Sequence, residues 1–190
     1  MYTILIVGYG SIGKRHFKNI SKSINAKIIV LTKQKNLQKL ESNNVFVTNS
    51  IKKALSYKPD IGFVTNETSL HVDTALTLAE NNMHLFLEKP LSHSMKNVLK
   101  LKKQIKKKKL ITQIGCHMRF HPCIKKIKNI LENNTLGRII SIYIESSSFL
   151  PDWHPCEDYR LGYAARDELG GGISLTCIHE IDLLYWFFGK

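Results

Sequence analysis

The chain has 190 residues, of which 43% are hydrophobic; this length allows one well-packed core, or one domain and part of a second. No apolar run is long enough to span a bilayer, and Met1 leads directly into a predicted strand. We therefore expect a cytoplasmic protein with neither a membrane span nor a signal peptide. The four cysteines are scattered without C-x-x-C spacing, which favours a reducing compartment over a disulfide framework or a zinc site.

The formal net charge is +13, and much of it lies in lysine runs such as residues 106–109. Such a charge can attract nucleic acid or a membrane surface. The runs carry no interleaved aromatic residues and no arginine cluster, however, which favours lysines that decorate solvated helix faces. We therefore expect neither a nucleic-acid partner nor a membrane partner, although the positive field would help to attract an anionic cofactor or substrate.

The first part of the chain alternates between β-prone runs and segments with helical spacing. Strands that alternate with helices at this pace predict an α/β fold with a doubly wound, Rossmann-type parallel sheet. We expect strands at residues 2–7, 27–31, 45–47, 61–65, 84–87 and 110–115, and helices after residue 10, at 50–57, at 70–81 and from Ser94 onward.

The pattern changes near Gly115, and we place a domain boundary at about Gly115 to Pro122. A connecting helix is expected at residues 122–133, and residues 139–147 alternate like a half-exposed strand of an antiparallel sheet. A polar and aromatic loop follows, and three glycines at 170–172 open a final helix. We expect a dinucleotide-binding Rossmann domain over residues 1–120 and an incomplete α+β substrate domain over residues 121–190.

The motif with the clearest bearing on function follows the first strand and opens the first helix. In this context the first glycine allows a tight turn, the second lets the backbone approach a pyrophosphate, and the third lets the helix pack closely on the strand. The helix N terminus then meets the phosphate charge. A plain structural turn is the alternative, but the position of the motif favours a dinucleotide site. Its residues are Gly8, Tyr9, Gly10, Ser11, Ile12 and Gly13.

The end of the second predicted strand bears on which dinucleotide binds. NAD-dependent enzymes usually carry an acidic residue there to hold the ribose 2′-hydroxyl. This chain instead has Thr32 and Lys33, followed by Lys35. A hydroxyl and a lysine would attract a 2′-phosphate that a carboxylate would repel. An NAD(P) cofactor is therefore expected, with NADP favoured over NAD.

Glu88-Lys89-Pro90, at the end of the fifth predicted strand, together with the glycine motif resembles the Gfo/Idh/MocA family of nicotinamide-dependent oxidoreductases. Further stretches match in the right order, and together they cover essentially the whole chain. They are Thr65-Asn66 and His71 after the fourth strand, Gly115 and Arg119 at the crossover to the second domain, Leu136-Gly137, and Gly170-Gly171-Gly172 followed by His179 and Asp182.

The resemblance implies hydride exchange between a nicotinamide and a hydroxyl or carbonyl carbon of a sugar, sugar phosphate or nucleotide sugar. Lys89 and His179 would lie beside the reacting carbon. A histidine suits the general base that removes the hydroxyl proton, and a lysine can stabilise the charge that develops on oxygen. Glu88 is expected to orient Lys89 or the nicotinamide amide, and a cis bond before Pro90 could aim the lysine.

Each of these roles has a structural alternative. Lys89 could be a surface lysine, and His179 could be a helix residue satisfied by Glu180. His71 and Asp182 are as compatible with packing as with ligand contact. Many family members carry an aspartate four residues before the active-site histidine, whereas Leu175 stands there in this chain. The proton relay must therefore differ in detail.

The loop that precedes the three glycines predicts substrate recognition. Aromatic faces stack on sugar rings, and arginines hold phosphate or carboxylate in a bidentate manner. These types point to a phosphorylated, acidic or nucleotide-linked sugar, although aromatic loops often only pack beneath a domain. The residues assigned to substrate are Arg119, Trp153, Tyr159, Arg160, Arg166 and Asp182.

Two further functions stay open, namely a non-catalytic dinucleotide-sensing module and nucleic-acid binding. The presence of both Lys89 and His179 argues against the first, and no recognition motif supports the second. The resemblance also implies that relatives continue beyond the final helix and form homo-oligomers through an antiparallel sheet. A single strand at 139–147 cannot satisfy its own edge hydrogen bonds. We therefore expect a partial chain whose first domain folds and whose catalysis alone is weak or absent.

Overall fold

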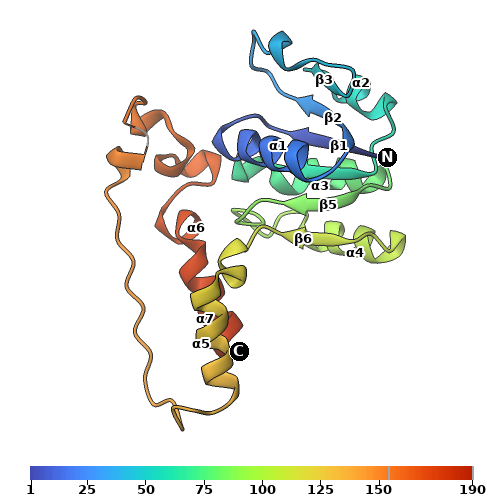
Figure 1. Ribbon diagram of the computed structural model, residues 1–190. Helices are drawn as coiled ribbons and strands as arrows, with labels where there is room; N and C mark the ends of the chain where they lie inside the picture. Colours follow the sequence, from blue (N-terminus) through green and yellow to red (C-terminus); the bar gives the residue numbers. More distant parts are fainter. Residues whose placement is uncertain (154, 190) are drawn as a thin grey trace. The chain divides into compact units, whose positions relative to one another are not determined.

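The computed structural model describes residues 1–153 and 155–189 and divides into two compact units, Met1–Gly115 and Cys116–Lys190. Each unit is described by itself. The first contains a parallel sheet with helices on both of its faces, and the second consists of helices, short turns and a long extended run (Figure 1).

The sheet of the first unit has six parallel strands in the order β3-β2-β1-β4-β5-β6. This is the doubly wound order in which the chain reverses direction between β1 and β4, and ligands bind at the carboxyl end of the strands at such a point. The predicted fold class is confirmed. The strands are β1 (Tyr2–Val7), β2 (Ala26–Leu31), β3 (Val45–Thr48), β4 (Ile61–Val64), β5 (His84–Leu87) and β6 (Thr112–Ile114).

Four α-helices connect these strands: α1 (Ser11–Ser23), α2 (Ile51–Ser56), α3 (His71–Glu80) and α4 (Val98–Lys108), with short 3₁₀ turns at Gln38–Leu40 and Thr68–Leu70. Helix α4 begins at Val98 and not at the expected Ser94. The residue before it, Asn97, has a φ of 60°, and a left-handed residue cannot belong to a right-handed helix. The prediction was therefore four residues early at this end.

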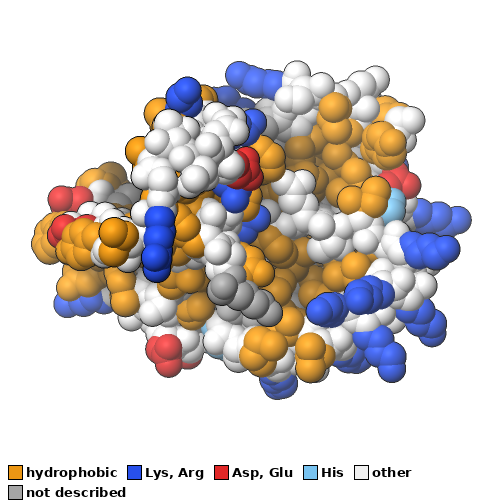
Figure 2. Space-filling view, turned by 90° about the horizontal axis from the view of Figure 1, so that it is seen from below, with side chains coloured by type: hydrophobic (Ala, Val, Ile, Leu, Met, Phe, Trp, Pro, Cys, Tyr) orange, Lys and Arg blue, Asp and Glu red, His pale blue; other side chains and the backbone are white. Residues whose placement is uncertain are grey.

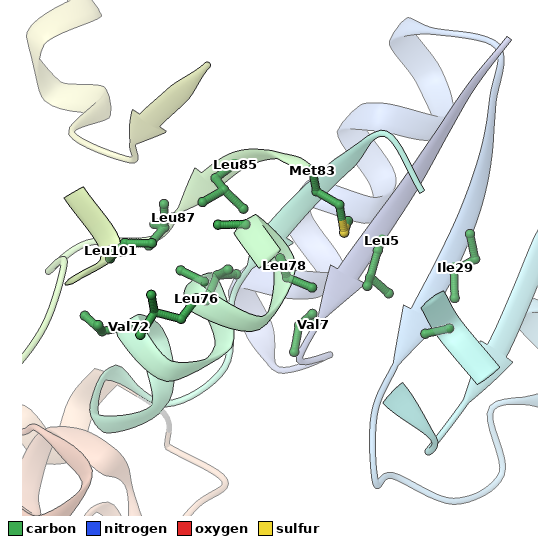
Figure 3. Close-up of a cluster of buried hydrophobic side chains, with 14 residues drawn as sticks. Leu5, Val7, Ile29, Val72, Leu76, Leu78, Met83, Leu85, Leu87 and Leu101 are labelled. Carbon is green, nitrogen blue, oxygen red and sulfur yellow. The ribbon is translucent and has the colours of Figure 1, made fainter. Parts of the chain in front are cut away.

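Alternation along the strands divides the core into two layers. In β1, Leu5 and Val7 belong to the cluster that packs beneath α3 and α4, whereas Ile4 and Ile6 belong to the cluster beneath α1. Figure 3 shows the first cluster, in which side chains from the strands meet those of α3. Because helices cover both faces, most positions of the central strands are apolar, which explains the hydrophobic runs in the sequence.

The excess positive charge is confined to one stretch of sequence. Residues 89–131 contain thirteen basic residues and no acidic residue, so this stretch accounts for the whole net charge. Five of these lysines lie exposed on α4, namely Lys100, Lys102, Lys103, Lys106 and Lys107. Figure 2 shows Lys and Arg side chains projecting from the surface with few acidic groups beside them. Among the described residues, no helix combines the length and apolarity that crossing a membrane requires.

The second unit contains η3 (His117–Phe120), α5 (Pro122–Glu132), α6 (Ile173–Thr176) and α7 (Ile178–Phe188), and the described residues of the loop between α5 and α6 form four 3₁₀ turns. These turns are η4 (Leu150–Trp153), η5 (Tyr159–Leu161), η6 (Tyr163–Ala165) and η7 (Asp167–Leu169). The expected final helix is in fact two helices, because the backbone at Cys177 departs from helical geometry (φ −96°, ψ 37°).

The predicted strand at residues 139–147 was wrong. These residues form no regular element, and Figure 1 draws them as an extended run. Their side chains are exposed, including 92% of Ile140 and 85% of Tyr143. The alternating pattern suits a strand, but a strand needs a neighbour to satisfy its hydrogen bonds. The described part of the second unit contains no strand that could serve as that neighbour.

Candidate functional site

The glycine turn leaves β1 at the carboxyl edge of the sheet, and two of its glycines are fixed by packing. Gly8 has a φ of 97°, and a Cβ there would lie 2.7 to 2.8 Å from the backbone of Thr65 and Asn66. A Cβ on Gly13 would collide with the carbonyl oxygen of Gly8. These two positions therefore require glycine for the turn itself, whether or not a ligand is bound.

Gly10 is different, because the space in front of it is open. It caps the start of α1, and a Cβ added there would meet nothing within 4 Å. Among the described residues, no side chain caps this helix and its first turn contains no acidic residue. The backbone amides of the first turn are thus presented to an open region, which is the arrangement that binds phosphate groups at helix N termini. The residues present fit a dinucleotide pyrophosphate.

The other three residues of the motif differ in their burial. Tyr9 is 6% exposed, and its ring packs edge-on against Phe17 at a centroid distance of 5.8 Å. Burial raises the pKa of the Tyr9 phenol. Ser11 is exposed and Ile12 is half-buried at the start of α1.

Thr65 joins the end of β4 to the glycine turn. Its hydroxyl lies 3.0 Å from the carbonyl oxygen of Val7 and 2.9 Å from that of Gly8. Thr65 is 4% exposed, and these two hydrogen bonds stabilise the glycine turn.

The loop after β2 is tied to the same turn by a residue that sequence analysis missed. The Gln34 side-chain amide donates to the carbonyl oxygen of Tyr9 at 3.0 Å, and its backbone N–H donates to the Thr32 hydroxyl at 3.2 Å. Lys33 and Lys35 are exposed beside it. Gln34 had no motif to mark it, since its partner lies 25 residues away.

His71 links the loops that follow β4 and β5. It is 1% exposed, and its Nδ1 lies 2.8 Å from the Pro90 carbonyl oxygen while its Nε2 lies 3.0 Å from that of Asn66. Burial lowers the pKa of His71, although its contacts with the two carbonyls raise it. The Asn66 side-chain amide donates in turn to Thr74 at 2.9 Å. His71 therefore connects the loop that follows β4 to the loop that follows β5.

Glu88 and Lys89 follow β5, and the bond between Lys89 and Pro90 is cis. One Glu88 oxygen lies 2.6 Å from Nε2 of His16, and the other accepts the backbone N–H of Lys89 at 3.2 Å. Burial raises the pKa of the Glu88 carboxyl, but the hydrogen bond and charge of His16 outweigh it and hold that pKa below its usual value. Sequence analysis did not single out His16 and missed this contact.

The first unit thus collects the predicted cofactor residues at one edge of its sheet. Residues from the ends of β1, β2, β4 and β5 contribute, and hydrogen bonds connect most of them. Lys89 belongs to this unit and His179 to the second. In the second unit, the His179 ring packs edge-on against His117 at a centroid distance of 4.7 Å. Sequence analysis did not single out His117.

The two charged residues assigned to substrate in the helical part of the second unit contact one another. Arg119 donates from Nε to Oδ2 of Asp182 at 2.8 Å and from its terminal nitrogen to Oδ1 at 2.5 Å. The hydrogen bond to Asp182 raises the pKa of the Arg119 guanidinium. This bidentate pair connects η3 to α7, the helix that carries His179.

The arginines of the preceding loop are also paired, each with a neighbour in sequence. Arg160 contacts Asp158 with Nε at 2.9 Å, and Arg166 contacts Glu168 with Nε at 2.7 Å. Such exposed pairs contribute little stability and exchange partners readily. Tyr159 is 42% and Trp153 is 37% exposed; the Trp153 indole donates to Ser148.

The three glycines that precede α6 lie against this loop. A Cβ on Gly171 would collide with the carbonyl oxygens of Tyr163, Ala164 and Arg166. The backbone N–H of Gly171 donates to Arg166 at 3.0 Å, and that of Gly172 donates to Ala164 at 3.0 Å. The close approach of two backbones explains why glycine is needed at residue 171.

Residues 2–116 match the Gfo/Idh/MocA family, described as the oxidoreductase family with an NAD-binding Rossmann fold. The chain belongs to this family, and its first unit is the NAD-binding Rossmann domain.

Among curated proteins, the chain is 30% identical over 191 residues to the uncharacterized oxidoreductase YrbE of Bacillus subtilis, and this match covers 97% of the chain and 53% of that protein. It is 27% identical to the myo-inositol 2-dehydrogenase of Thermotoga maritima, covering 97% of the chain and 54% of the relative. The chain thus spans about half the length of these relatives.

Two solved structures show the same fold. The myo-inositol 2-dehydrogenase of Lactobacillus plantarum superposes with a TM-score of 0.81 at 22% identity, covering 99% of this chain and 56% of the other. The WlbA (WbpB) dehydrogenase of Thermus thermophilus, in complex with NAD and UDP-GlcNAcA, has a TM-score of 0.75 at 19% identity, covering 100% of this chain and 64% of the other.

Proposed function

We propose that the chain is part of an NAD(P)-dependent oxidoreductase that acts on a CH–OH group, and that it binds the dinucleotide pyrophosphate over Gly10. The observation that carries this proposal is the open region in front of Gly10, the N-cap of α1, where no described side chain caps the helix. The flanking glycines are needed for the turn, whereas Gly10 has room for any small side chain. A ligand that approaches the backbone gives a reason for glycine there.

Lys89 and His179 are proposed as the catalytic residues. When bound, the nicotinamide would accept or supply the hydride. His179 would take the hydroxyl proton of the substrate, and Lys89 would stabilise the charge on the substrate oxygen. Curated relatives named as inositol dehydrogenases and levoglucosan dehydrogenase support a sugar or polyol substrate.

The loop residues Trp153, Tyr159, Arg160 and Arg166 are proposed to contact the substrate. The local ion pairs of the two arginines are exposed, so a substrate carboxylate or phosphate could replace Asp158 or Glu168 at little cost. Arg119 and Asp182 are proposed instead to position α7, because each satisfies the other's charge.

The cofactor is proposed to be NADP in preference to NAD. Thr32 and the exposed Lys33 follow β2, where NAD-dependent enzymes usually carry an acidic residue, and neither of them would repel a 2′-phosphate. The Gln34 amide keeps this loop against the glycine turn, which would place both groups beside the adenosine ribose.

A non-catalytic dinucleotide-binding module is the second candidate. Its support is Leu175, which stands where many family members carry an aspartate partner for the active-site histidine. Retention of Lys89 and His179 favours the enzyme.

The test is turnover of inositols, sugars, sugar phosphates and nucleotide sugars, followed by nicotinamide absorbance, for this chain beside a full-length homologue. Lys89→Ala and His179→Ala should lower any turnover by about a hundredfold to ten-thousandfold. The exposed Lys96→Ala and His93→Ala serve as matched controls. Near-parental turnover in folded Lys89→Ala or His179→Ala variants would refute the catalytic roles.

A further inference from the structure

Two side chains that lie 72 residues apart in sequence connect the helix of the glycine turn to the segment that follows β5 and carries Lys89. Nε2 of His16, on α1, lies 2.6 Å from Oε1 of Glu88. The two side chains are only 17% and 11% exposed. A contact this short between an imidazole and a buried carboxylate is a charge-assisted hydrogen bond when the ring donates, and such bonds are stronger than neutral ones.

Packing fixes the His16 ring in this position. The ring lies 5.4 Å from that of Phe63 on β4 and 5.0 Å from that of Phe86 on β5. The two phenylalanine rings stack on each other at 4.9 Å. His16 is therefore held against aromatic surface, and only its Nε2 edge reaches the carboxylate.

Glu88 is equally constrained. Its second oxygen accepts the Lys89 backbone N–H at 3.2 Å. A Cβ on Gly115 would lie 3.2 Å from both carboxylate oxygens, so the absence of a side chain there makes room for the group. The carboxylate is thus enclosed by His16, by the Lys89 backbone and by Gly115, the residue that follows β6.

We propose that His16 is a positioning residue that acts through Glu88 on the Lys89 backbone and so orients the lysine of the active site. This inference rests on the proposed function, because it gives Lys89 a reason to be oriented. It also means that the helix expected to bind the pyrophosphate and the lysine expected to act on the substrate share one hydrogen-bonded connection. His16, three residues after the glycine motif of residues 8–13, would then also contribute to the function of the site.

The test uses His16→Phe in the full chain. A phenylalanine ring can keep the packing against Phe63 and Phe86 but cannot donate to Glu88. Amide hydrogen exchange is measured without cofactor, and the Lys89 amide is compared with core amides such as Leu5 and Ile29. The variant loses the hydrogen bond between His16 and Glu88, which should weaken the bond from the Lys89 N–H to the same carboxylate. Exchange of the Lys89 amide should therefore become about threefold to tenfold faster relative to the core.

His16→Gln should restore part of the protection, since a glutamine amide can donate to the same carboxylate. Asn19→Ala, at an exposed position of α1, is the matched control and should behave like the parent. If the contact were merely structural, its loss would speed amide exchange throughout the first unit, and the Lys89 amide would change no more than the core amides. Lys89 exchange within the parental range in a folded His16→Phe variant would overturn the inference.

Glu88→Gln provides a second arm if His16→Phe fails to fold. It keeps the size of the side chain but removes the charge, and it should also expose the Lys89 amide selectively; parental exchange in this variant would equally overturn the inference. Failure of the proposed function would be seen separately, as no calorimetric binding of NAD or NADP by the parent protein. In a catalytically competent preparation, His16→Phe should lower kcat more than it changes KM for the cofactor.

Discussion

Arg119 and Asp182 form a bidentate ion pair within the second unit, with Nε 2.8 Å from Oδ2. The Asp182 side chain is 13% exposed and that of Arg119 is 33% exposed. The pair connects η3, which begins the second unit, to α7, which bears His179. Sequence analysis had assigned both residues to substrate contact, whereas this ion pair gives them a structural role.

Arg119→Ala should therefore destabilise the second unit, because it leaves a largely buried carboxylate without its partner. A loss of about 1 to 3 kcal/mol is expected. Denaturant unfolding of Arg119→Ala, Asp182→Ala and the double variant measures the coupling between them. If the two single losses simply add in the double variant, the pair does not stabilise the unit.

Acid should weaken the first unit through Glu88. His16 holds the pKa of this carboxyl below its usual value although burial opposes that shift, so the folded state favours the ionised form more than the unfolded state does. The stabilisation is present above the unfolded pKa and is lost as the pH falls through the folded pKa. Unfolding free energies measured from neutral to acidic pH should converge for the parent and Glu88→Gln. A stability difference that is constant down to the lowest pH would contradict this.

The third glycine of the motif should be needed for stability. Gly13→Val would place a branched side chain against the Gly8 carbonyl and the Thr65 hydroxyl, and overpacking of this kind costs about 1 to 3 kcal/mol or more. Thermal unfolding followed by circular dichroism measures the loss. Lys14→Ala, at the next and exposed position of α1, is the control. A parental melting temperature in Gly13→Val would show that the helix is not packed as closely as described.

Lys33 should contribute to the choice of cofactor. Lys33→Glu would place a negative charge near the proposed 2′-phosphate, and we expect NADP affinity to fall by about tenfold while NAD affinity changes little. Lys52→Glu, at an exposed position of α2, controls for the change in net charge. Dissociation constants of both cofactors decide the matter. An equal loss for NAD and NADP would remove Lys33 from the specificity determinants.

The fold could be read from sequence because its signals are local. Apolar strands, glycine turns and amphipathic helices follow one another along the first unit, and that alternation predicts a parallel, doubly wound sheet. The contacts of His16 with Glu88 and of Arg119 with Asp182 could not be read, since each joins residues more than 60 positions apart. Alternation at residues 139–147 was misleading for a related reason, because strand formation depends on a partner that a local pattern does not reveal.

Calorimetric titration of the full chain and of Gly10→Val with NAD and NADP tests the central claim most directly. Gly10 has a φ of −72° and no atom within 4 Å of its added Cβ, so the variant should fold and melt like the parent. Its side chain would occupy the region proposed for the pyrophosphate, and binding of both dinucleotides should fall by at least tenfold. Parental affinity in a folded Gly10→Val variant would contradict the assignment of the dinucleotide site to the glycine turn.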